Sequence, residues 1–87
     1  MRTFEDLTND IAISLPTDIH IVTKQPVGGM VCQSSDGKRR AVLVENGPNG
    51  PQLRFEGIGA PPAFDAPLDD RDAPRNCVAA IVAYLSP

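Results

Sequence analysis

The middle of the chain alternates short apolar runs with clusters of turn-forming residues. The apolar runs cover residues 19–23, 30–32, 41–44 and 53–55, and the clusters between them cover residues 25–29, 35–38 and 46–51. Short runs bounded by Gly, Pro, Asn and Asp are typical of antiparallel hairpins. The pattern therefore predicts an antiparallel β-meander of three to four strands over residues 19–58. Its strongest turn signal is Asp36-Gly37, which predicts a type I′ turn with positive φ at both central residues.

The strands differ in how their apolar positions are arranged. Residues 52–56 alternate, which predicts that Leu53 and Phe55 face a core while their neighbours face water. Residues 41–44 are apolar throughout, which indicates a central strand with both faces at least partly covered. An apolar strip on the outer face of the sheet, made of Val22, Val31 and either Val42 or Leu43, is either a partner surface or the ordinary scatter of apolar residues on a protein.

Apolar residues recur at helical spacing on both sides of this meander. Thr3 is a suitable N-cap, Asp6 supplies the acid of a capping box, and Pro16 ends the first helix. A second helix begins near Asp72 and continues to Leu85. Together the patterns predict a two-layer α+β fold in the order α-β-β-β-β-α, with both helices packed on one face of the antiparallel sheet.

The meander and the second helix are joined by a Pro-rich acidic connector at residues 57–71. Three prolines between residues 61 and 67 exclude a helix there and favour extended backbone. Phe64 is the isolated aromatic residue of this connector, and it either staples the connector to the core or serves as an interface anchor. With the connector included, residues 1–87 form a single domain.

Charge narrows the classes of partner. The formal net charge is −3, which disfavours direct binding to nucleic acid or to an anionic membrane. The longest apolar stretch is far shorter than the ~20 residues that cross a bilayer. The N-terminal residues include Glu5, Asp6 and Asp10 where a signal peptide would be apolar. We therefore expect a cytoplasmic protein that binds neither nucleic acid directly nor a membrane.

Few residues carry catalytic chemistry. His20 is the single histidine, and it has no cysteine or histidine at ligand spacing beside it. Cys32 and Cys77 are expected to be small buried hydrophobic residues, with a disulfide as the alternative. No motif couples either cysteine to His20, so we predict no catalytic, cofactor-binding or metal-binding residue.

Charged clusters and Phe64 are the candidates for partner binding. The aspartates before the second helix either compensate the helix dipole or present an acidic surface to a basic partner, such as a nucleic-acid-binding protein. The basic triplet 38–40 at a hairpin tip is a solvated strand edge or a partner contact. The predicted partner-binding residues are Phe64, Asp65, Asp69, Asp70, Asp72, Lys38 and Arg39.

The lack of a catalytic constellation in the sequence favours a non-catalytic protein-binding module over an enzyme. In size and layout this small acidic chain resembles phage-encoded inhibitors of bacterial defence, such as anti-CRISPR proteins. That resemblance implies inhibition of a larger, nucleic-acid-binding protein without any cofactor. Two alternatives stay open, namely a homodimeric chaperone or adaptor and a small enzyme or enzyme subunit that uses His20. The expected state is a monomer or a homodimer.

Overall fold

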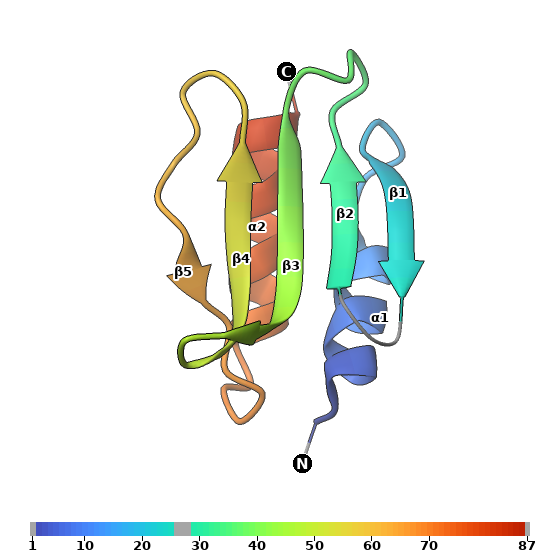
Figure 1. Cartoon of the computed structure of the whole chain (residues 1–87). Coiled ribbons are helices and arrows are strands. Elements are labelled where there is room, and N and C mark those ends of the chain that lie inside the picture. Colours follow the sequence, from blue (N-terminus) through green and yellow to red (C-terminus); the bar gives the residue numbers. More distant parts are fainter. Residues whose placement is uncertain (1, 26–28, 87) are drawn as a thin grey trace.

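Two helices cover one face of a five-stranded antiparallel sheet in the computed structural model, which describes residues 2–25 and 29–86 (Figure 1). The elements are α1 (Phe4–Ser14), β1 (His20–Gln25), β2 (Gly29–Gln33), β3 (Arg40–Gly47), β4 (Gly50–Glu56), β5 (Phe64–Asp65) and α2 (Ala73–Leu85). The strands lie in the order β1-β2-β3-β4-β5, each antiparallel to its neighbours. The predicted α+β fold with terminal helices is confirmed.

The sheet has one strand more than the three or four that the sequence predicts. Residues 64–65, which the prolines around them assign to an extended connector, pair with residues 52–53 of β4. The Ala66 N–H extends this pairing by donating to the Pro51 carbonyl oxygen at 2.8 Å. Because β5 contains only two residues, it is too short to show a periodic pattern of its own.

The core lies between the sheet and the helices and is mainly aliphatic. As its apolar run predicts, β3 lies at the centre of the strand order. Its Ala41 and Leu43 are buried under the helices, whereas Val42 and Val44 on the other face are only half-buried. The alternation predicted for β4 is also confirmed, because Leu53 is buried and Arg54 is exposed.

Both cysteines are free thiols within this core. Burial raises the pKa of Cys32 to about 11 and the pKa of Cys77 to about 12. Both side chains are therefore protonated at neutral pH and behave as small hydrophobic residues, in agreement with the sequence-based expectation.

The start of α1 has the predicted capping box. The Thr3 hydroxyl oxygen accepts a hydrogen bond from the Asp6 backbone N–H at 3.1 Å, and Asp6 Oδ2 accepts one from the Thr3 N–H at 3.0 Å. The hydrogen bond from the Thr3 backbone holds the pKa of the Asp6 carboxyl below its usual value. The helix ends at Ser14, just before the proline that the sequence marks as its limit.

The turn at Asp36-Gly37 differs from the predicted type I′ turn. Among the described residues only glycines have a positive φ, and here it is Gly37 alone, at 76°. Asp36 Oδ1 accepts hydrogen bonds from the Ser34 hydroxyl at 2.7 Å and from the Lys38 N–H at 3.0 Å. The bond from Ser34 also lowers the pKa of the Asp36 carboxyl. The aspartate side chain thus stabilises a longer loop by hydrogen bonds to residues on either side of it, which local turn propensity does not reveal.

Two other turns bear on the predictions. The expected turn at 25–29 lies largely outside the described residues. The predicted loop at 46–51 is a tight turn, because Gly47 pairs with Gly50 and leaves only Pro48 and Asn49 between the strands.

The register of β1 against β2 shifts by one residue at Val22, which forms a β-bulge. No described helix is long and apolar enough to span a membrane.

Candidate protein-binding groove

An apolar groove lies between α2, the end of β4 and the β4–β5 segment (residues 57–63). We call it the aromatic groove. Its volume is about 570 Å³, which falls within the usual range of ligand-binding clefts. Its walls are formed by the aromatic side chains of Phe55, Phe64 and Tyr84, by Pro61, Pro62, Ala63 and Gly59 of the β4–β5 segment, and by Ala80 and Ala83 of α2.

Three aromatic rings from three different elements line this groove. The Phe55 ring lies 5.6 Å from the Tyr84 ring at an interplanar angle of 81°, and 6.3 Å from the Phe64 ring at 33°. The Phe55–Tyr84 pair is edge-to-face, an arrangement that contributes about 0.5–1.5 kcal/mol beyond burial of the ring area. The cluster therefore joins β4, β5 and α2, while the half-buried Phe55 and Phe64 keep part of their surface exposed.

The β4–β5 segment is held against α2 by the tyrosine hydroxyl. Tyr84 Oη donates to the Ile58 carbonyl oxygen at 3.0 Å, with a longer contact of 3.4 Å to the Glu56 carbonyl oxygen. Gly57 between them has a φ of 129°, and a Cβ there would lie 2.7 Å from Tyr84 Oη and 2.9 Å from the Lys38 carbonyl oxygen. Only glycine combines this backbone conformation with such a close approach, so the start of the segment is fixed.

Phe64 is predicted either to hold the connector against the core or to anchor a partner, and its position is compatible with both roles. It is half-buried and packs against the core, and it also lines the aromatic groove. Asp65 follows it on the opposite face of β5 and is exposed, with Oδ2 accepting a hydrogen bond from Asn49 Nδ2 at 3.2 Å. Ile58, on the same β4–β5 segment, is 89 % exposed. Of the predicted binding residues, Phe64 therefore lines this groove and Asp65 does not.

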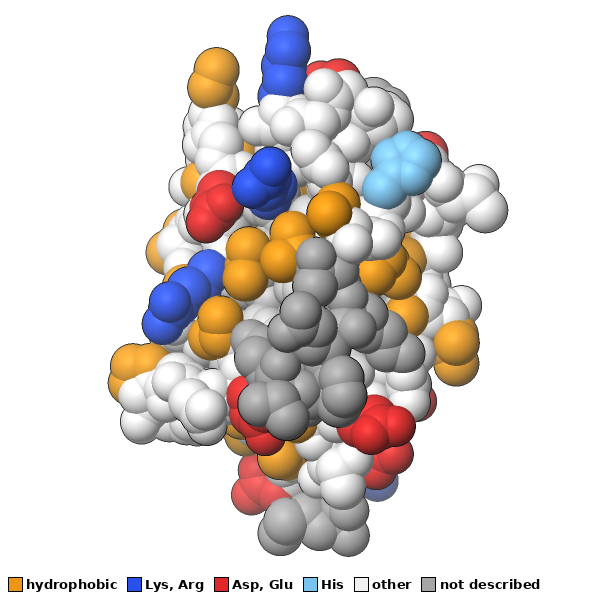
Figure 2. Space-filling model, turned by 45° about the vertical axis from the view of Figure 1, so that its right-hand side comes forward, with side chains coloured by type: hydrophobic (Ala, Val, Ile, Leu, Met, Phe, Trp, Pro, Cys, Tyr) orange, Lys and Arg blue, Asp and Glu red, His pale blue; other side chains and the backbone are white. Residues whose placement is uncertain are grey.

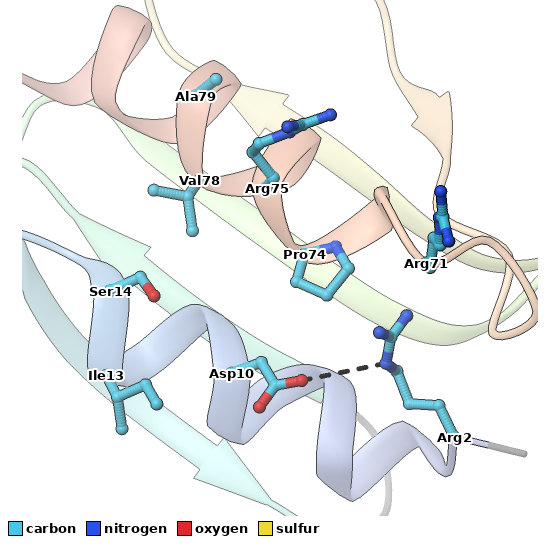
Figure 3. Close-up of a pocket in the computed structure, with 9 residues that line it drawn as sticks. All are labelled: Arg2, Asp10, Ile13, Ser14, Arg71, Pro74, Arg75, Val78 and Ala79. Carbon is cyan, nitrogen blue, oxygen red and sulfur yellow. Dashed lines mark ion pairs between the residues drawn. The ribbon is translucent and has the colours of Figure 1, made fainter.

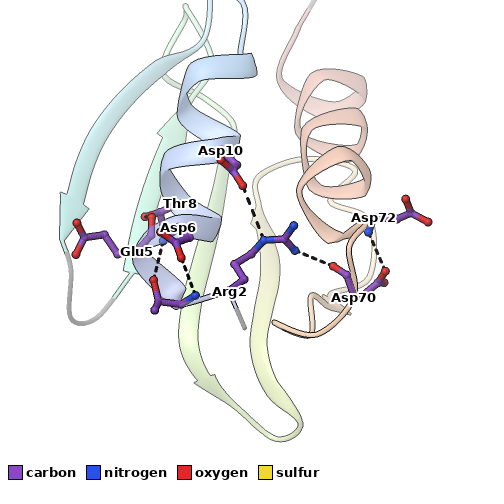
Figure 4. A network of polar contacts seen from close by, with 8 residues as sticks. Arg2, Glu5, Asp6, Thr8, Asp10, Asp70 and Asp72 are labelled. Atoms are coloured by element: carbon purple, nitrogen blue, oxygen red, sulfur yellow. Dashed lines mark hydrogen bonds and ion pairs between the residues drawn. The ribbon is translucent and has the colours of Figure 1, made fainter.

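Two of the aspartates before α2 organise the turn that leads into the helix. Asp70 Oδ1 accepts a hydrogen bond from the Asp72 N–H at 2.9 Å, and the Asp70 carbonyl oxygen accepts one from Arg2 Nη1 at 2.8 Å. Asp72 occupies the N-cap position without capping the helix, and it forms an ion pair with Arg75 at 3.1 Å. Figure 4 shows Arg2 between Asp10 of α1 and this turn, so it ties the N-terminal ends of both helices together.

The remaining charged candidates lie at opposite ends of the molecule. Asp69 is exposed and forms no side-chain hydrogen bond or ion pair within the described part of the chain. Lys38 and Arg39 belong to the β2–β3 hairpin, at the end away from the turn into α2 (Figure 1). Arg39 Nη1 donates to the Tyr84 carbonyl oxygen at 3.3 Å, and its guanidinium lies 5.6 Å from the centre of the Tyr84 ring. Arg39 therefore supports the last turn of α2 and the aromatic cluster instead of joining the acidic residues.

Sequence reasoning missed most of the groove because its walls come from distant segments. It named Phe64, assigned Phe55 to the core face of its strand, and did not single out Tyr84. A usable signal is present in α2, where Ala80 and Ala83 place small side chains beside the single tyrosine of the chain. Small residues next to an aromatic residue on one helix flank leave room for a groove.

His20 lies at the start of β1, is exposed, and is opposite Gln33 in the register with β2. Among residues 2–25 and 29–86, no group of three or more His, Cys, Asp or Glu side chains is arranged to hold a metal ion.

No protein-family model, curated protein or solved structure matches the chain. The function is therefore inferred from the shape and chemistry of the surface.

Proposed function

We propose that the protein is a non-catalytic binding module that takes an apolar side chain of a partner protein into the aromatic groove. The groove is the observation that supports this function. Interfaces gain most of their affinity from a few anchor side chains buried in well-packed pockets. Aromatic and proline walls lose little conformational freedom when such an anchor binds, and here Tyr84 and Gly57 hold them in place before binding.

Charge favours a basic partner. The chain carries a net charge of −3, and Asp65, which follows Phe64 in β5, is exposed on the opposite face of that strand. A protein that binds nucleic acid offers such a basic surface, because it must neutralise phosphates. We therefore propose an inhibitor that acts in the cytoplasm on a larger, nucleic-acid-binding protein, in the manner of phage-type anti-defence proteins such as anti-CRISPR proteins.

The test uses a tagged protein, capture from a host lysate and mass spectrometry of what remains bound at moderate salt. Ala83→Gln fills the groove from an exposed position with a good helix former, whereas Ala79→Gln on the same helix lies outside the aromatic groove and is the matched control. We expect Ala83→Gln and Phe64→Ala each to reduce capture of the partner, the latter by more than about 2 kcal/mol of binding free energy. Equal capture by all three variants and the unmodified protein would contradict the proposal.

One observation favours the homodimeric chaperone or adaptor as a second candidate. On the sheet face away from the helices, Val31, Val42 and Val44 are only half-buried, and Val22 in the bulge of β1 is 56 % exposed. Figure 2 shows apolar side chains gathered across the middle of the molecule on this side. A molecular mass that rises with concentration, and that Val42→Lys returns to the monomer value, would favour this candidate over a monomeric inhibitor.

A further inference from the structure

A groove of about 550 Å³ lies between α1 and α2 (Figure 3), but its charged border is largely neutralised within the chain. Arg2 Nε lies 3.8 Å from Asp10 Oδ2, and Arg75 Nη2 lies 3.1 Å from Asp72 Oδ1. Charge in this groove therefore selects no particular partner. The turn between β3 and β4 instead contains reactive groups that the aromatic groove does not use.

This turn contains two Asn-Gly pairs, Asn46-Gly47 and Asn49-Gly50, and a proline follows each of them. Asparagine is thermolabile because its side-chain amide can be lost by deamidation. A following glycine favours the reaction, since it has no side chain to keep its backbone nitrogen away from the asparagine side chain. Both asparagines are exposed. Because the two pairs share the sequence Asn-Gly-Pro, the fold around them is the main source of any difference in their reactivity.

The fold leaves room at one pair and crowds the other. Deamidation begins when the glycine nitrogen attacks the asparagine Cγ, so the peptide unit that joins the two residues must rotate. A Cβ added at Gly50 would meet no non-neighbouring atom within 4 Å, whereas one at Gly47 would lie 2.7 Å from Gln52 Cβ. A register shift also separates the Gly47–Gly50 pair from the next pair, Val44–Gln52, so the turn can open without disturbing the rest of the hairpin. Asn49-Gly50 is therefore the pair with the freedom to react.

The Asn49 side chain connects this turn to β5. Asn49 Nδ2 donates a hydrogen bond to Asp65 Oδ2 at 3.2 Å. β5 has only two residues, and beyond its pairing with β4 it is held by the Ala66 N–H, which donates to the Pro51 carbonyl oxygen at 2.8 Å. Deamidation would replace the donating NH₂ group with a carboxylate oxygen, so the hydrogen bond to Asp65 would be lost and two negative charges would lie side by side.

We propose that Asn49 is a site of spontaneous deamidation and that the reaction loosens β5 from β4. Phe64 of β5 lines the aromatic groove, so the reaction would also loosen one wall of that groove, whatever the groove binds. The chemistry itself is independent of the function proposed for the groove.

The reaction needs only a base and water. The Gly50 backbone nitrogen loses its proton to the base and forms a bond to Asn49 Cγ, and the side-chain nitrogen takes up a proton and leaves as ammonia. Water then opens the cyclic imide at one of its two carbonyl carbons, which gives either aspartate or isoaspartate at this position. The net change exchanges an amide and water for an acid and ammonia, without an oxidant or a reductant.

The first test follows both asparagines in the full chain. The protein is kept in mildly alkaline buffer, either folded or unfolded in urea, and sampled over time. Trypsin cleaves after Arg40 and Arg54, so one peptide of residues 41–54 contains both pairs, and tandem mass spectrometry locates the deamidated position. We expect Asn49 to react at least about fivefold faster than Asn46 in the folded protein and at a similar rate in urea. Equal rates in the folded protein, faster reaction at Asn46, or a ratio that persists in urea would overturn the proposal.

The second test measures the effect on β5. Asn49→Asp reproduces the aspartate product, and Asn46→Asp adds the same charge at the other pair as the matched control. Hydrogen exchange of the Ala66 N–H, followed by NMR, reports the pairing of β5 with β4. We expect exchange to be about threefold faster or more in Asn49→Asp and unchanged in Asn46→Asp.

A swapped double variant separates charge repulsion from other effects of the substitution. Asn49→Asp combined with Asp65→Asn again places one amide beside one carboxylate, so it should restore the exchange rate of the Ala66 N–H to that of the unmodified protein. Unchanged exchange in Asn49→Asp, equal acceleration in Asn46→Asp, or a double variant that exchanges as fast as Asn49→Asp would overturn the proposal.

Discussion

The close approach of Gly57 to the Tyr84 hydroxyl predicts a measurable coupling between two substitutions. Gly57→Ala places a side chain where φ is 129° and where its Cβ would meet Tyr84 Oη at 2.7 Å and the Lys38 carbonyl oxygen at 2.9 Å. Backbone strain of this kind costs about 1–3 kcal/mol, and reduced freedom of the unfolded chain returns about 0.4–1 kcal/mol. With the crowding added, we expect a net loss of about 2 kcal/mol in the free energy of unfolding.

Tyr84→Phe removes the hydroxyl that donates to the Ile58 and Glu56 carbonyl oxygens. These carbonyls belong to exposed residues and can bond to water, so the loss should be about 1 kcal/mol or slightly less. In the double variant the Cβ introduced at position 57 no longer meets Oη, so only the contact with the Lys38 carbonyl oxygen still crowds it. We therefore expect the double variant to lose about 0.5–1 kcal/mol less than the sum of the two single losses.

The assay is urea-induced unfolding of all four proteins, followed by circular dichroism. The slope of the free energy against urea should be the same in each, which shows that the same surface is exposed on unfolding. Two results would refute the reasoning. Losses that add to within about 0.3 kcal/mol would mean that the new side chain does not meet the hydroxyl. A Gly57→Ala variant as stable as the unmodified protein would mean that the positive φ is not required.

Three further predictions concern the core, the thiols and the capping box. Leu43→Ala, at a fully buried position of β3, should lower the free energy of unfolding by about 2–5 kcal/mol. Ile13→Ala, at an exposed position, should change it by no more than about 0.5 kcal/mol, and urea unfolding of the two variants tests the difference. Burial raises the pKa of Cys32 to about 11 and of Cys77 to about 12. A thiol–disulfide exchange reagent at pH 8 should therefore modify the folded protein slowly and the urea-unfolded protein rapidly. Fast reaction of the folded protein would contradict the burial of the two thiols. Because the folded-state pKa of Asp6 is lowered, its stabilising effect is complete above the unfolded value of about 3.9 and is lost as the pH falls through the folded pKa. Asp6→Asn should therefore be less stable than the unmodified protein at pH 7, and thermal unfolding should show that difference shrink below about pH 4; a difference that does not change with pH would rule this out.

Features whose interactions are local in sequence could be predicted. The capping box joins Thr3 and Asp6 within one helical turn, and the central position of β3 follows from an apolar run that needs both faces covered. The hairpin predicted at Asp36-Gly37 is confirmed, but its type I′ geometry is wrong, because the aspartate side chain bonds to Ser34 and Lys38 and stabilises a longer loop. β5 was missed because two residues carry no periodicity and gain their structure from β4.

The candidate site could be predicted only in part, for a related reason. Phe64 stands out in the sequence as an aromatic residue among prolines, but its neighbours in space are set by the register of β4 with β5 and by the packing of α2. Tyr84 joins the groove because α2 packs beside β4, which brings its ring to 5.6 Å from the ring of Phe55. Neither relation is encoded in a local pattern of residues.

The strand order has a consequence for the way in which the chain folds. Every strand pairs with its neighbour in the sequence, so the sheet can assemble by closing short loops at low entropic cost. Contact between α1 and α2 instead joins the two ends of the chain. It depends on the sheet, whose strands lie between the two helices in the sequence. We expect the hairpins of β2, β3 and β4 to form the folding nucleus and α2 to dock late. Because α2 forms one wall of the aromatic groove, the groove would come into existence only in the last step of folding.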